Sequence, residues 1–356
     1  MKIAIVGYGY MGQMYAELAQ AQNWELVGVH DVDNTAFKSD KFFQSRSELI
    51  SHPSVDAVII CTPHSQHLAI LKECLKQKKH VILEKPMGSS EAEADEIYRK
   101  IQKHKATSVV VVNITHCFYD NIRLAKERLS EHDIHSIISI HDSVVFPIKN
   151  EERDWWLFKK EKVGHGVLLT NGCHLLARIL YLFSEYKPKF EVKGGICANL
   201  NRLGDIDDTE AHIRLDLLLS DQRKIPVTVY ANWPVAKSKD EAIQESMEVH
   251  TDHGTLHIQA WNEVAFYQDQ NEKLSKEVPF TRDTIAPQLA KGVKNVLKSF
   301  EEAVSAKQGT VHHSVEQTYQ AEKAIGIFYS QFTHHAKRSE SHSRLVQALD
   351  CEMARP

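Results

Sequence analysis

The chain has 356 residues, 42% apolar and 25% charged, which is the balance of a globular protein large enough for two domains. A formal net charge of −4 gives no basic surface for nucleic acid, and no apolar stretch is long enough to span a membrane. The six cysteines make no C-x-x-C pair and no disulfide framework, so a reducing, cytoplasmic compartment is expected.

The first expected element is a strand at Lys2–Val6, and a helix is expected at Met11–Gln20. Around the junction, Gly7, Gly9 and Gly12 have the G-x-G-x-x-G spacing. Strand, glycine turn and helix in this order predict a dinucleotide-binding site, with a glycine turn that binds nothing as the alternative. Because a strand opens the chain, no signal peptide is expected there.

Each glycine has a physical task in such a site. Gly7 permits the tight turn, Gly9 lets the backbone approach a pyrophosphate, and Gly12 lets the helix lie close to the strand. The pyrophosphate would rest on unpaired N–H groups at the helix start, around Tyr10 and Met11, where the helix dipole favours negative charge.

A second strand is expected at Glu25–His30, and Asp31 follows it directly. An acid about 20 residues past the glycines is where ribose hydroxyls need a bidentate acceptor, and its carboxylate repels a 2′-phosphate. No Lys or Arg follows until Lys38, so the pattern favours NAD over NADP as the cofactor. The alternative is that Asp31 simply caps a turn.

Strands and helices continue to alternate over the first third of the chain. Strands are expected at Asp56–Cys61, His80–Leu83 and Ser108–Asn113, with a short one near Lys41–Gln44, and helices at His67–Gln77 and Ser90–Lys103. This pattern predicts an α/β fold with a parallel, doubly wound sheet, a Rossmann domain over residues 1–118. Ligands of such sheets bind beyond the carboxyl ends of the strands.

Two segments at strand ends are therefore candidates for ligand contact. One contains Thr62 and Pro63, and the other is Glu84-Lys85-Pro86. Pro86 suits the first position of the helix beyond it and holds Lys85 extended. The ammonium of Lys85 would then lie over the cofactor crevice, unless Lys85 is an ordinary solvated surface residue.

After residue 120 the expected strands become longer and several follow one another directly, which favours antiparallel pairing. Strands are expected at Ile134–Phe146, Lys189–Leu200, Glu210–Leu219, Lys224–Trp233, Met247–His253, Gly254–Ala260 and Val264–Tyr267, and helices at Asn121–Ser130, Leu168–Phe183, Pro287–Ser305 and His313–Phe332. We expect an α+β domain over residues 119–335 with a large, open, mostly antiparallel sheet, and a tail over 336–356. An exposed sheet face needs covering, which favours a homodimer or homotetramer.

The 21 histidines include several closely spaced pairs, but no acids or cysteines complete a recognised metal motif around them. No protein-bound metal is expected, and most of these histidines are interpreted as surface or turn residues.

Five segments together resemble the Gfo/Idh/MocA family of oxidoreductases, over nearly the whole chain. They are GYGYMG at 7–12, AVIICTPHSQH at 57–67, KKHVILEKPMG at 78–88, GHGVLLTNGCHLLARILYLF at 164–183 and HTDHGTLHI at 250–258. The resemblance implies a Rossmann domain, a second α/β domain whose open sheet often forms the subunit interface, and NAD(P) bound non-covalently. It also implies a sugar, cyclitol or related polyol as the substrate.

Matching to the family's motifs assigns roles to particular residues. Lys85 corresponds to the catalytic lysine and His174 to the acid/base histidine. Thr62, Pro63 and His67 correspond to positions that line the ribose and nicotinamide end of the cofactor.

One position departs from the family's pattern. The motif usually has an aspartate four residues before the histidine, and this chain has Thr170 there. On a helix, Thr170 would share a face with His174 and could reach the substrate or the imidazole, but it cannot supply a negative charge. Another acid could serve, the substrate could sit differently, or redox activity could be reduced. Asn171 is a further polar neighbour for a substrate hydroxyl.

Oxidising a secondary alcohol needs a hydride acceptor and a proton acceptor. With NAD+ as the hydride acceptor, His174 is the expected base because an ordinary histidine pKa of about 6.5 suits neutral pH. Lys85 would stabilise negative charge on the oxygen, although the two roles could be exchanged. Glu84 either orients Lys85 or is a structural acid.

Substrate contacts are expected from side chains that recognise sugars by hydrogen bonds and aromatic faces. The candidates besides Lys85, Thr170, Asn171 and His174 are His116, Arg153, Trp155 and His165. The adjacent tryptophans can instead belong to packing. Arg178 is either a helix-surface charge or part of a basic cleft that suits an acidic sugar.

The leading interpretation is an NAD-dependent oxidoreductase that transfers a hydride between the cofactor and a secondary hydroxyl of a sugar, sugar phosphate or cyclitol. An NAD-binding sensor without turnover is a second interpretation, motivated by Thr170. An NAD-assisted glycoside hydrolase is a third, although the sequence offers no evident extra base for it.

Overall fold

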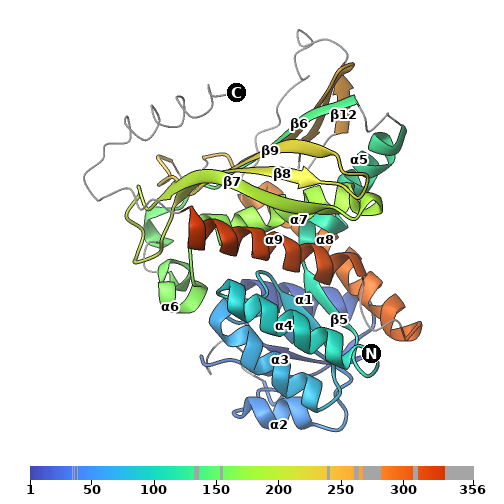
Figure 1. Ribbon diagram of the computed structural model, residues 1–356. Coiled ribbons are helices and arrows are strands. Elements are labelled where there is room, and N and C mark those ends of the chain that lie inside the picture. The colour runs from blue at the N-terminus through green and yellow to red at the C-terminus, as the bar shows by residue number, and fades with distance from the viewer. Residues whose placement is uncertain are drawn as a thin grey trace.

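The structure, a computed structural model, describes residues 1–332 apart from 34, 36, 38, 132–135, 153–154, 239–240, 260–263, 268–281 and 308–311. The expected tail over 336–356 therefore lies outside the described residues. Two sheets, one above the other, are separated by a layer of helices (Figure 1).

The first sheet is parallel throughout. Its strands are β1 (Lys2–Val6), β2 (Glu25–His30), β3 (Ala57–Ile60), β4 (His80–Glu84) and β5 (Val110–Asn113), in the order β2-β1-β3-β4-β5. The helices between them are α1 (Tyr10–Ala21), α2 (Arg46–Ser51), α3 (His67–Lys76) and α4 (Glu91–His104). The strand order reverses between β1 and β3, which is where a doubly wound sheet opens a ligand crevice.

Alternating side chains of the strands pack into two separate hydrophobic clusters, one on each face of the sheet. Ile3 and Ile5 of β1 pack in one cluster with Tyr15 of α1, whereas Ala4 and Val6 pack in the other with side chains of α2, α3 and α4. Continuous apolar strands are the signature of a sheet that is covered on both faces. The expectation of a parallel, doubly wound sheet is confirmed.

Three local expectations were wrong. The short strand near residues 41–44 is a single bridge between Val29 and Phe42, and helix α2 was missed because six residues show no clear period. Pro86 does not begin a helix. Helix α4 begins at Glu91, where the hydroxyl of Ser90 accepts a hydrogen bond from the Glu93 N–H, the start of a capping box.

The second sheet is open and mostly antiparallel, as expected. Its strands are β6 (Ile137–Val145), β7 (Lys189–Ala198), β8 (Glu210–Leu218), β9 (Lys224–Asn232), β10 (Gln244–Thr251), β11 (Gly254–Gln259) and β12 (Val264–Tyr267). They lie in the order β12-β11-β10-β6-β9-β8-β7, and within the described ranges only β6 and β9 pair in parallel.

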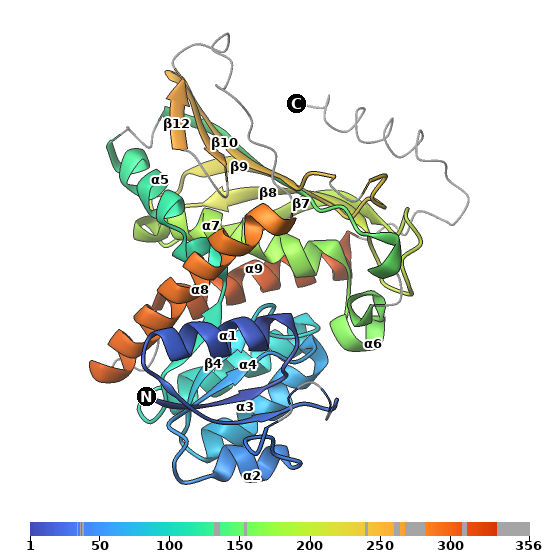
Figure 2. The same cartoon turned by 180° about the vertical axis from the view of Figure 1, so that it is seen from behind.

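Helices cover the second sheet on the side that faces the first sheet. They are α7 (Cys173–Leu182), α8 (Arg282–Ser305) and α9 (His312–Gln331), while α5 (Asp120–Glu131) lies at one end and α6 (Lys160–Val163) lies near the first sheet. Figure 2 shows α8 crossing above α1, and α9 contacts both α4 and α7. These contacts fix the first sheet and its helices (the cofactor half expected from the sequence) against the second sheet and its helices. In the described ranges, no helix is both long enough and apolar enough to cross a membrane.

Candidate active site

The turn between β1 and α1 leaves room for a ligand at its middle glycine. A Cβ on Gly7, whose φ is +91°, would lie 2.5 Å from the carbonyl oxygen of Cys61, and one on Gly12 would lie 2.2 Å from that of Gly7. On Gly9 a Cβ would meet nothing within 4 Å. Helix α1 starts at Tyr10, and no side chain caps its N-terminus. The turn therefore fits a diphosphate, held by backbone N–H groups.

Asp31 lies directly after β2 and ties that strand to the glycine turn. Its Oδ2 accepts a hydrogen bond from the Tyr8 N–H at 2.6 Å, and its Oδ1 accepts one from the Asp33 N–H at 2.8 Å. The carboxylate thus closes a turn, as the alternative interpretation held, and it also stands beside the predicted pyrophosphate site. Ribose hydroxyls would bind the same two oxygens.

The ends of β3 and β4 are held together by a buried histidine. His67 is fully buried, with Nδ1 2.9 Å from the carbonyl oxygen of Pro86 and Nε2 2.9 Å from that of Thr62. Both ring nitrogens face backbone carbonyl oxygens, so His67 holds the two strand ends together and offers no free ring nitrogen to a ligand. The residue that remains available is Thr62, whose buried Oγ1 has no hydrogen-bond partner in the described structure.

Lys85 connects the two halves of the molecule. Its Nζ donates a hydrogen bond to the carbonyl oxygen of Thr170 at 3.1 Å. The preceding Glu84 turns the other way, because its Oε1 accepts a hydrogen bond from the Asn113 Nδ2 at 2.6 Å, and burial raises its pKa. Of the two roles considered for Glu84, the structure supports that of a buried structural acid.

A second acid that the sequence did not single out fixes the loop after Lys85. Glu322 of α9 accepts hydrogen bonds from the N–H groups of Met87 and Gly88, at 2.5 and 3.3 Å. Burial raises the pKa of Glu322 to about 8. Glu322 shares a buried helix face with Ala321 and Ile325, and a charged residue on such a face needs a partner.

The helix that carries His174 begins with an irregular turn. Residues Leu168–Gly172 form a π-helical turn and α7 follows at once. The Oγ1 of Thr170 and the Nδ1 of His174 are both buried without a hydrogen-bond partner in the described structure. Two unpaired polar atoms beside Lys85 are suited to a ligand that carries hydroxyl groups.

His174 is held in its neutral form. Burial lowers its pKa well below the usual value of 6.5, and His116, Lys85 and Arg178 lower it further by charge repulsion. The imidazole therefore presents an unprotonated nitrogen at neutral pH, which a general base requires.

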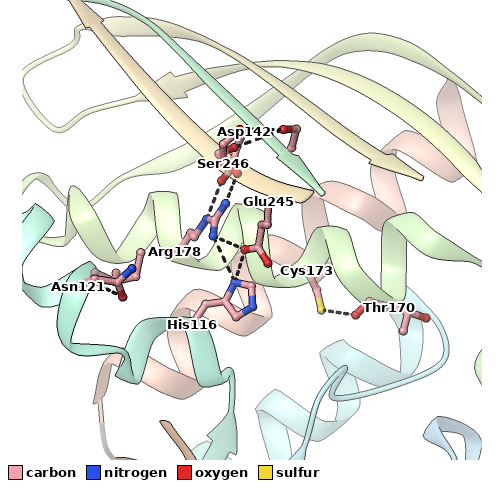
Figure 3. Close-up of polar contacts among 10 residues, drawn as sticks. His116, Asn121, Asp142, Thr170, Cys173, Arg178, Glu245 and Ser246 are labelled. Atoms are coloured by element: carbon pink, nitrogen blue, oxygen red, sulfur yellow. Dashed lines mark hydrogen bonds and ion pairs between the residues drawn. The ribbon is translucent and has the colours of Figure 1, made fainter. Parts of the chain in front are cut away.

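A buried ionic cluster joins Arg178 to Asp142 and Glu245, with His116 beside it (Figure 3). Arg178 donates from Nε to Asp142 at 2.9 Å, and also hydrogen-bonds the second oxygen of Asp142 and the carboxylate of Glu245. Nδ1 of His116 lies 3.2 Å from Oε1 of Glu245, and the His116 ring stacks on that of His174 at 4.1 Å between centroids.

The proposed surface position of Arg178 is wrong, because its side chain is completely buried. The apolar residues around Arg178 in the sequence already indicated that it is buried. Leu175, Leu176, Ala177 and Ile179 are all buried, and a helix that is apolar all round is an interior helix. A cation there must pair with acids from elsewhere in the fold.

The remaining predicted contacts are placed as follows. His165 has Nδ1 2.6 Å from Asp207, and its ring stacks on Tyr329 at 3.8 Å. The Oδ1 of Asn171 accepts a hydrogen bond from the Trp233 indole at 2.9 Å. Trp155 is 40% exposed. The first two are thus already engaged within the protein, while Arg153 lies outside the described residues.

Among the described side chains, no group of three or more His, Cys, Asp or Glu residues could hold a metal ion. Cys61, Cys74, Cys117, Cys173 and Cys197 are free thiols, and Cys351 lies outside the described residues.

His64 predicts a measurable pH effect on folding. It is 3% exposed, and burial lowers its pKa well below 6.5. As the pH falls through about 6.5, the unfolded chain binds a proton that the folded chain refuses, so stability is lost by up to about 1.4 kcal/mol per pH unit. Urea unfolding at pH 7.5, 6.5 and 5.5 should therefore show a shallower loss for His64→Gln than for the wild type. The control His253→Gln changes an exposed side chain and should keep the wild-type slope; equal slopes for His64→Gln and the wild type would contradict the expectation.

Comparison with known proteins agrees with the geometry. Residues 1–113 match the family model described as an oxidoreductase family with an NAD-binding Rossmann fold. Myo-inositol 2-dehydrogenase of Thermotoga maritima is 23% identical over 331 residues, which cover 87% of this chain and 92% of that enzyme. Glucose-6-phosphate 3-dehydrogenase of Bacillus subtilis is 28% identical over 193 residues, only 52% of this chain and 54% of that enzyme.

A solved structure shares the fold over almost the whole length. The crystal structure of scyllo-inositol dehydrogenase from Lactobacillus casei, with bound NAD(H) and scyllo-inositol, superposes with a TM-score of 0.71 at 19% identity. The superposition covers 93% of this chain and 96% of that one. The resemblance carried by the sequence motifs is thereby confirmed: residues 1–113 match the Gfo/Idh/MocA oxidoreductase family with its NAD-binding Rossmann fold, and the chain as a whole shares the fold of the solved structure.

Proposed function

We propose that the chain is an NAD-dependent dehydrogenase that oxidises a secondary hydroxyl of a sugar, sugar phosphate or cyclitol. The observation that carries the proposal is the contact between Lys85 and the Thr170 carbonyl, one helical turn before His174. It brings a cation from the cofactor half and a neutral base from the second half to one place. The names of the relatives, which act on inositol and glucose 6-phosphate, support a polyol substrate.

The proposed division of labour follows from charge and burial. The cofactor, when bound, accepts the hydride. The ammonium of Lys85 stabilises negative charge that develops on the substrate oxygen, and the neutral imidazole of His174 accepts the hydroxyl proton. The unpaired Oγ1 atoms of Thr62 and Thr170 offer hydrogen bonds to ligand hydroxyls. Substrate contacts from His116, Trp155, His165, Asn171 and Arg153 are part of this proposal.

The test is a panel of inositols, sugars and sugar phosphates incubated with NAD+ at alkaline pH, followed by NADH absorbance. Reduction of NAD+ by a member of the panel, lost in His174→Ala, is the expected result. Tight NAD binding without turnover on any member of the panel would contradict the dehydrogenase and favour an NAD-binding sensor. Release of an aglycone from a glycoside without net NADH would replace it by a hydrolase.

Two glycines should separate cofactor binding from stability. Gly9→Ala places a methyl group in open space where a diphosphate would lie, so NAD affinity should fall at least tenfold with Tm unchanged. Gly12→Ala drives a methyl group against the Gly7 backbone, so Tm and affinity should both fall. Calorimetric NAD titration and thermal unfolding measure the two effects. Full NAD affinity in Gly9→Ala would show that the diphosphate does not sit there.

Asp31 should select between the two nicotinamide cofactors. In Asp31→Ala the acceptor for the ribose hydroxyls and the charge that repels a 2′-phosphate are both removed. The ratio of kcat/KM for NAD to that for NADP should fall at least tenfold. Asp33→Ala, which removes a neighbouring acid, is the control and should keep the wild-type ratio. An unchanged ratio in Asp31→Ala would mean that another residue reads the ribose.

We also propose a cytoplasmic homodimer or homotetramer that associates through the outward face of the second sheet. In the part of the chain that the structure describes, the helices packed on this sheet lie on one of its sides (Figure 1), and free thiols suit a reducing compartment. The outward face is polar, with His141, His212 and Tyr230 among its residues, so a weak, hydrated interface is expected. Light scattering after gel filtration measures the oligomeric state, and a monomer at micromolar concentration would rule the interface out.

A further inference from the structure

We propose that Glu245 and His116 are positioning residues for His174, and that they do together what a carboxylate beside His174 would do alone. This inference rests on the proposed function, because it assigns a role in the proton transfer to His174. Neither residue touches the reacting atoms in the proposal. Glu245 acts through the ring of His116, and His116 acts through the ring of His174.

The imidazole of His174 is oriented by ring stacking. A general base on a histidine is commonly aligned by a hydrogen bond to its second ring nitrogen. Here Nδ1 of His174 is the buried, unpaired atom offered to the ligand, and the described structure has no side-chain hydrogen bond that aligns the imidazole from its other nitrogen. The contact that fixes the plane of the ring is the stack with His116, with 4.1 Å between centroids and 21° between planes.

His116 is itself held by the buried ionic cluster. Its Nδ1 lies 3.2 Å from Oε1 of Glu245 and 3.5 Å from Nη1 of Arg178, and the ring is 6% exposed. Since burial and the positive charges of Arg178 and Lys85 keep its pKa well below the usual value, His116 is neutral and donates one hydrogen bond. In the proposed arrangement His116 carries its proton on Nδ1 and donates it to Oε1 of Glu245, while Nη1 of Arg178 donates to the same carboxylate. The orientation of the stacked pair is thus set from strand β10.

A protonated His174 would need a negative charge nearby. When His174 takes a proton, it becomes positive next to Lys85 and Arg178, and its helix neighbour Thr170 is uncharged. The acids of the adjacent cluster are Asp142 on β6 and Glu245 on β10. The two carboxylates carry two negative charges and Arg178 carries one positive charge, so the cluster has a net charge of −1. It lies on the far side of His116. Low dielectric surroundings make such a compensating charge effective.

Thr170 leaves the helix of His174 without an acid at that position. The acid that supports His174 arrives from the second sheet instead of from the same helix. Glu245 sits in the alternating pattern of β10 as an inward-facing, buried residue, with Met247 and Val249 as its inward neighbours. A carboxylate in a row of core residues is costly unless it is paired, and its partners here are Arg178 and His116.

The test uses the full chain loaded with NAD and has one arm that needs no substrate. In protein labelled with 13C-histidine, the ring C–H signals of His174 are assigned by their loss in His174→Asn. Stacking on His116 should shift these signals upfield. His116→Ala should move them downfield, and His116→Phe, which keeps a stacked ring, should leave them upfield. Signals that do not move in His116→Ala would overturn the inference even if no substrate has been found.

The second arm follows turnover on a substrate from the panel. Glu245→Gln keeps the shape and removes the charge, so kcat should fall about tenfold, with the KM for NAD unchanged. The acidic limb of the kcat/KM profile should move to lower pH, because the protonated His174 loses its compensating charge. Adding Thr170→Asp to Glu245→Gln should restore part of kcat. A purely structural role for Glu245 would lower the folded fraction and leave the limb in place.

Matched variants keep the result interpretable. Glu248→Gln makes the same change three residues along β10, on its outward face, and should leave kcat and its pH profile unchanged. If Glu245→Gln does not fold, His116→Phe takes its place, since it breaks the link to Glu245 while keeping the stack, and it should lower kcat. Wild-type turnover and pH dependence in whichever variant folds would overturn the inference.

Discussion

Replacing Lys85 by methionine should reduce kcat for polyol oxidation by about a thousandfold while NAD still binds. Methionine keeps the length of the side chain and removes the ammonium that hydrogen-bonds the Thr170 carbonyl and would stabilise the substrate oxygen. Steady-state NADH formation measures kcat, and calorimetry measures NAD affinity. Lys72→Met removes a partly exposed lysine paired with Glu96 and should keep full activity. A kcat within tenfold of the wild type in Lys85→Met would remove Lys85 from the chemistry.

Arg178→Met should lower the free energy of unfolding by about 3–5 kcal/mol, since it strands the carboxylates of Asp142 and Glu245 without their cation. Both acids are buried in contact with Arg178. Urea unfolding at neutral pH gives the value. Arg46→Met breaks a partly exposed pair with Glu73 and should cost less than about 1 kcal/mol.

The double variant Arg178→Met with Asp142→Asn should recover part of that loss, because one of the stranded charges is gone. A cost below about 1 kcal/mol for Arg178→Met alone would mean that the carboxyl groups of Asp142 and Glu245 become protonated, and thus neutral, when the cation is removed.

Most of the secondary structure could be predicted because its signals are local. The apolar run of β1 and the glycines that follow define a strand, a turn and a helix within twelve residues, and the structure has them at Lys2–Val6 and Tyr10–Ala21. Helix α2 lacked such a signal, because six residues are too few for a helical period. The failure at Pro86 had a different cause: the capping box at Ser90, four residues on, was the stronger start signal.

The site divides in the same way. Lys85 and His174 stand in motifs that can be read along the chain, and the structure brings both to the Thr170 turn. Glu245 and Glu322 stand in no motif. Each is identified only by what it meets across the fold, His116 and Arg178 in one case and the Met87 backbone in the other. Tertiary contacts of this kind are absent from any local pattern.

The π-helical turn at Leu168–Gly172 has a consequence for how this region can vary. Such a turn contains one residue more than an α-helical path between the same ends. Deleting a single residue there would restore an α-helical path and leave the later side chains of α7 in register. Inserting a residue at the start of α7 would instead rotate every later side chain by about 100°. The imidazole would then leave its stack and the guanidinium its acids in one step, so the chain should tolerate a deletion in the turn far better than an insertion in the helix that follows.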